Sequence, residues 1–169
     1  MPYDCGIVAV ADRAAHLAAM SATAAYLTAK EAGDGVNFIP EMSRRGRQVP
    51  VYAALRSLGR AGLAELVERC CALAARAAAR LEALPGAEVL NDVVLNQVLV
   101  RFGDDDAVTQ AVIDGVVRSG EAWLGGTVWR GRAAARISVS NWMTTEADVD
   151  RLVTALSAAL AAEAHSRHG

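Results

Sequence analysis

The spacing of apolar residues changes near residue 51 and again near residue 86. Before the first change, residues 5–11 form a continuous apolar run, CGIVAVA, that ends at Asp12. Such a run is typical of a strand buried on both faces of a parallel sheet. A parallel strand needs neighbours that are reached through crossover helices, but residues 14–40 are small and irregular, with Gly33, Gly35 and Pro40 as breakers. We therefore expect residues 5–11 to be one edge of a larger α/β sheet.

From Val51 the pattern is helical. Apolar residues recur every three or four positions as far as Leu84, where Pro85 and Gly86 follow. Gly59 interrupts the apolar stripe before it resumes at Leu63. The pattern predicts two helices joined at Gly59.

Beyond residue 86 the pattern alternates between strands and helices. The predicted elements are strands at 88–90, 93–102 and 136–140, a helix at 104–119 and a helix from 144 or 145 to about 164. Thr145 and Asp148 form an approximate capping box for the last helix. We expect Gly125-Gly126 to make a turn between strands. This part is predicted to be an α+β unit, with helices on one face of a small antiparallel sheet.

Composition and charge limit the classes of protein. The chain has 169 residues, 53% of them hydrophobic, and a net charge of −2, which fits one soluble domain, or one domain and a piece of another. The near-neutral balance argues against nucleic acid as a partner, and no apolar run approaches the roughly 20 residues of a membrane-spanning helix. Because no signal peptide is recognised, we expect a cytoplasmic protein.

Several polar groups favour structural roles over a metal site. Glu163, His165 and His168 lie near the C-terminus, where a solvated tail is expected. The run at 104–106, three aspartates, lacks the ligand spacing of a calcium loop and suits the start of a helix. Cys5, Cys70 and Cys71 are expected to be free thiols. We predict no metal site.

Two candidates for chemistry remain open on the residues alone. Ser43 opens a cluster, SRRGR, that is either an anion site or the solvated start of a helix. Tyr26 is either a packing aromatic or a proton donor carried on a loop.

The order of several motifs resembles one family. The motifs are PYDCG at 2–6, YL at 26–27, PEMSRR at 40–45, LRSLGR at 55–60, VLNQV at 94–98 and RISVSNW at 136–142. In this order and spacing they resemble the C-terminal part of the group II amino acid decarboxylases that depend on pyridoxal 5'-phosphate. The resemblance extends to about Leu156.

The resemblance implies a fold, a cofactor and two site residues. The fold would be the end of a fold-type-I large domain with its catalytic loop (1–50), interdomain helices (51–85) and the small C-terminal α+β domain (86–169). Tyr26 matches the family's proton-donating tyrosine on a mobile loop. Ser43 matches the residue that contacts the cofactor phosphate across the dimer interface. The family's cofactor-bonded lysine precedes the segment that resembles residues 2–6, and Lys30 does not match it.

The resemblance also sets expectations for function. It implies decarboxylation of an L-amino acid by a homodimer, or by this chain docked to an upstream half. Because the lysine has no match in these 169 residues, we expect the chain alone to be inactive. Two alternatives are a non-catalytic interaction module and a gene remnant.

Overall fold

The structure, a computed structural model, describes residues 5–21, 35–41 and 45–168. The chain divides into two compact units, Met1–Gly59 and Arg60–Gly169. Tyr26, Lys30 and Ser43 lie outside the described residues. Among the helices described, none is both long and apolar enough to span a bilayer.

The first unit differs from the sequence prediction at two places. Residues 5–10 have no regular secondary structure, so the predicted strand at 5–11 is wrong for this chain, and Val8 is 82% exposed. No described strand of this unit pairs with the run, and a strand without a partner gains no ladder of hydrogen bonds. Helix α1 (Arg13–Met20) and the 3-10 helix η1 (Gly35–Phe38) occupy part of the stretch expected to be irregular. The Asp12 side chain caps α1 by accepting the Ala15 N–H at 3.0 Å.

Helix α2 (Gln48–Glu82) confirms the predicted helix pair. Gly59 is not helical, with φ 62° and ψ −171°, a conformation open almost only to glycine. The helix ends before Pro85 and Gly86, as the sequence predicts.

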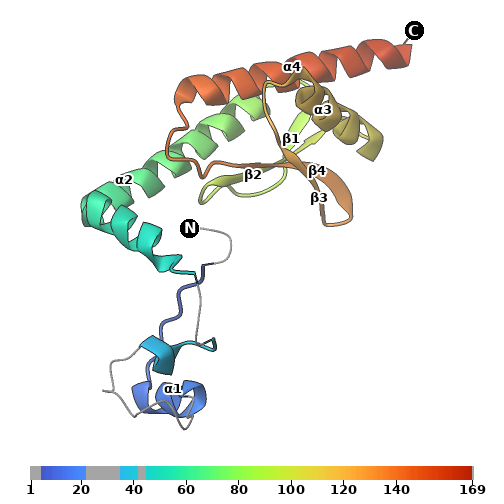
Figure 1. The fold of residues 1–169 in the computed structure, drawn as a ribbon. Coiled ribbons are helices and arrows are strands. Elements are labelled where there is room, and N and C mark those ends of the chain that lie inside the picture. The colour runs from blue at the N-terminus through green and yellow to red at the C-terminus, as the bar shows by residue number, and fades with distance from the viewer. Residues whose placement is uncertain (1–4, 22–34, 42–44, 169) are drawn as a thin grey trace. The chain divides into compact units, whose positions relative to one another are not determined.

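The second unit contains a four-stranded antiparallel sheet in the order β1-β2-β4-β3 (Figure 1). Its strands are β1 (Ala87–Val89), β2 (Gln97–Phe102), β3 (Gly125–Trp129) and β4 (Arg132–Ser138). The prediction of a turn at Gly125-Gly126 is wrong, because both glycines lie within β3. The turn lies instead at Arg130 and Gly131, which both have positive φ, as a tight two-residue hairpin requires.

Helices cover one face of this sheet. Helix α3 (Asp106–Ser119) and helix α4 (Glu146–His168) confirm the two predicted helices, and α4 continues past the expected end near residue 164. The capping box is also confirmed, since the Thr145 N–H donates to Asp148 Oδ2 at 2.9 Å. The core joins α3, α4, the second half of α2 and alternate residues of β2, namely Val98, Val100 and Phe102.

The part of α2 from Cys70 to Leu81 contributes to this core, so the second compact unit begins before residue 86. The division into 1–50, 51–85 and 86–169, as domains of a larger enzyme, stays a prediction.

Candidate functional site

The described residues on either side of Tyr26 contact each other. The His16 ring of α1 lies edge-on to the Phe38 ring of η1, with ring centroids 5.7 Å apart. The guanidinium carbon of Arg13 lies 4.6 Å from the centroid of the same Phe38 ring. The segment that contains Tyr26 therefore starts and ends at elements that are packed together. Its role as proton donor stays a prediction.

The basic cluster that Ser43 opens leads directly into α2. Arg45 is exposed, and its carbonyl accepts the Arg47 N–H at 2.7 Å. Helix α2 begins one residue later, at Gln48. The predicted position before a helix is confirmed, and exposed amides at a helix start suit an anion. Contact between Ser43 and a phosphate stays a prediction.

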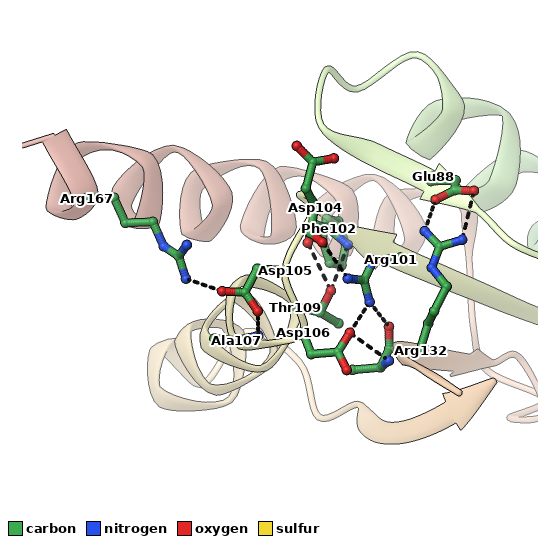
Figure 2. Close-up of polar contacts among 11 residues, drawn as sticks. Glu88, Arg101, Phe102, Asp104, Asp105, Asp106, Ala107, Thr109, Arg132 and Arg167 are labelled. Atoms are coloured by element: carbon green, nitrogen blue, oxygen red, sulfur yellow. Dashed lines mark hydrogen bonds and ion pairs between the residues drawn. The ribbon is translucent and has the colours of Figure 1, made fainter. Parts of the chain in front are cut away.

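The most buried charged group described is Arg101 of β2, which is 4% exposed. Its guanidinium donates to the Asp106 carboxylate, to the Ala133 carbonyl at 3.1 Å and to the Asp104 carbonyl at 2.9 Å (Figure 2). Asp106 also accepts the Ala133 N–H at 3.1 Å. The hydrogen bond from Arg101 holds the pKa of Asp106 below its usual value. This network joins β2, β4 and the start of α3.

A second ion pair crosses the sheet beside Arg101. Glu88 lies directly opposite Arg101 in the β1–β2 register, and its carboxylate pairs with Arg132 of β4 (Figure 2). The hydrogen bond from Arg132 lowers the pKa of Glu88. The run at 104–106 has the predicted structural role, because Asp105 caps α3 by accepting the Ala107 N–H at 3.1 Å.

A third cluster connects α2 to α4. Arg76 binds the two carboxylate oxygens of Asp150 at 3.0 and 2.9 Å, and Arg80 binds Asp150 at 2.8 Å. Arg76 also lies 3.2 Å from Glu146. A planar guanidinium and a carboxylate joined by two hydrogen bonds fix the orientation of both helices. Beside this cluster, Arg69 and Trp142 help to line a groove of about 370 Å³.

This cluster predicts an acid dependence of stability. The hydrogen bond from Arg76 lowers the pKa of Asp150. A carboxylate whose folded pKa is depressed stabilises the fold above its unfolded pKa, near 3.9, and loses this contribution as the pH falls through the folded value. We expect Asp150→Asn to flatten the decline in urea midpoint between about pH 5 and pH 2.

The matched control for this prediction is Asp92→Asn, since Asp92 is exposed in the loop between β1 and β2. An Asp150→Asn variant whose urea midpoint falls with decreasing pH as steeply as that of the wild type would contradict the prediction.

The described clusters can do little chemistry by themselves. Their charged groups are paired with each other, and the residues described contain no group of three or more potential metal ligands. Ion pairs of this kind position helices and strands. They offer neither a nucleophile nor an open coordination site.

Comparison with known proteins identifies the family. The family model described as "Pyridoxal-dependent decarboxylase conserved domain" matches residues 1–102. The chain belongs to this family. No curated protein sequence matches the chain.

Solved structures of pyridoxal-dependent decarboxylases share the fold. TDC of Oryza sativa, with PLP and tryptamine, has a TM-score of 0.78 at 18% identity over 87% of this chain and 33% of that one. Tryptophan decarboxylase of Catharanthus roseus, with L-tryptophan, has a TM-score of 0.68 at 21% identity over 85% of this chain and 33% of its own. Mouse CSAD has a TM-score of 0.74 at 16% identity over 85% of this chain and 34% of its own.

The chain therefore spans about a third of the length of the structures it matches. Its fold is that of the C-terminal part of fold-type-I decarboxylases, as the resemblance predicts.

The family cofactor is pyridoxal 5'-phosphate. The described residues do not make a complete site for it. Lys30, the only lysine of the sequence, lies outside them, and their charged clusters are closed by internal ion pairs. No reaction step is assigned to these clusters.

Sequence reasoning missed the network around Arg101. The available signal was one arginine inside the apolar strand VLVRF, followed after Gly103 by three aspartates. An arginine in a half-buried strand needs a partner, and the nearest carboxylates are those that start the next helix.

Proposed function

We propose that the chain forms the C-terminal part of an enzyme that decarboxylates an L-amino acid with pyridoxal 5'-phosphate. The observation that carries the proposal is the match of the decarboxylase family to residues 1–102. When bound, the cofactor withdraws electrons from the substrate carbon that loses CO₂. In this proposal Tyr26 holds the proton that this carbon receives, and Ser43 contacts the cofactor phosphate.

The packing of α1 on η1 supports the role of Tyr26. His16 and Phe38 bring together two elements that lie on opposite sides of Tyr26 in the sequence. This contact holds the described elements before and after the segment that contains Tyr26 close together. A homodimer, or docking to an upstream half, would supply the remaining cofactor contacts. A cytoplasmic location stays a prediction.

We expect the 169-residue chain alone to release no CO₂ from any L-amino acid. The physical reason is that Lys30 does not match the family's cofactor-bonded lysine, and loss of such a covalent group removes most of a rate enhancement. The measurement is CO₂ release with added pyridoxal phosphate, together with an absorbance spectrum after excess cofactor is removed. A stoichiometric cofactor band that shifts with an amino acid would contradict this expectation.

The role of Tyr26 can be tested in a chimera in which this chain replaces the matching third of the Oryza sativa enzyme. Tyr26→Phe is expected to lower kcat by about 10²–10⁴-fold, the usual contribution of a positioned acid. Tyr52→Phe is the matched control, because Tyr52 is an exposed tyrosine of α2. Equal rates for the two variants would remove Tyr26 from the reaction.

A second candidate function is a non-catalytic interaction module. The observation in its favour is the exposure of Ile7 and Val8, which are 69% and 82% exposed. Exposed apolar runs favour association with a partner. Calorimetric titration of the chain into a full-length decarboxylase, compared with an Ile7→Asp variant, tests this alternative.

A further inference from the structure

We draw no further inference here: the strongest candidate, the groove of about 740 Å³ between α3 and α4 that Gly115, Ala155 and Ala159 line in part, is a stripe of small residues, and nothing among the described residues shows what covers it.

Discussion

Arg101→Ala is expected to destabilise the second unit by about 3 kcal/mol, because charge-assisted hydrogen bonds contribute about 1.5–3 kcal/mol each and buried groups are left unpaired. The guanidinium is 4% exposed and binds Asp106 and the carbonyls of Asp104 and Ala133. Alanine removes these donors and leaves two carbonyls without them. Urea unfolding followed by tryptophan fluorescence measures the loss, since all tryptophans lie in this unit.

The matched control is Arg136→Ala, since Arg136 is an exposed arginine of the neighbouring strand β4. Its expected effect is within about 0.5 kcal/mol, as for most surface substitutions. Arg101→Lys should recover only part of the loss, because an ammonium group cannot reproduce the planar fork. Comparable losses for Arg101→Ala and Arg136→Ala would show that the buried network does not hold the strands and helix together.

Phe102→Ala is expected to lower the free energy of unfolding by about 3–5 kcal/mol, the usual cost of removing a buried aromatic ring. Phe102 ends β2, is fully buried and belongs to the core shared by the sheet and the helices. Its N–H and carbonyl also bond the Thr109 hydroxyl, both at 3.0 Å. The ring therefore lies where β2 meets α3, and its loss leaves a cavity there.

The same unfolding experiment measures this effect at one fixed protein concentration, because association would shift the midpoint. Phe102→Leu should cost less than Phe102→Ala, since the cavity is smaller. Leu95→Ala is the exposed control and should change stability by no more than about 0.5 kcal/mol. If Phe102→Ala were as mild as Leu95→Ala, the core as described would be wrong.

The sequence predicted best where local signals and packing agree. Gly59 and Pro85 mark real interruptions of the helical pattern, and the Thr145 capping box starts α4 as expected. In these cases backbone sterics or a local hydrogen bond determines the structure of a few neighbouring residues. Tertiary contacts do not change the conformation that these local effects favour.

The errors arose where pairing partners decide the structure. The apolar run at 5–11 has the pattern of a buried strand, but a pattern cannot supply the neighbouring strands. Gly125 and Gly126 resemble a turn, yet the register with Arg136 and Ala135 holds them in β3. Arg130 and Gly131 make the turn instead, because the hairpin requires positive φ at two consecutive residues.

The site was predicted only through family resemblance. Tyr26 and Ser43 come from motif order, and their chemistry depends on groups distant in sequence, which spacing alone does not reveal. The network of Arg101 was accessible in principle, since an arginine inside a strand requires a partner. Its partner Asp106 is close in the sequence, but the Ala133 carbonyl is brought to Arg101 only when β4 pairs with β2.

The strand order also determines which parts of the second unit are able to fold early. The β3–β4 hairpin closes through the Arg130-Gly131 turn, a local event that takes microseconds in isolated hairpins. The central β2–β4 ladder joins segments that lie on either side of α3, so its formation has to close a long loop first. We expect this non-local ladder to limit the folding rate. Until it forms, the β4 edge of the early hairpin, which β2 covers in the folded unit, stays available to other chains.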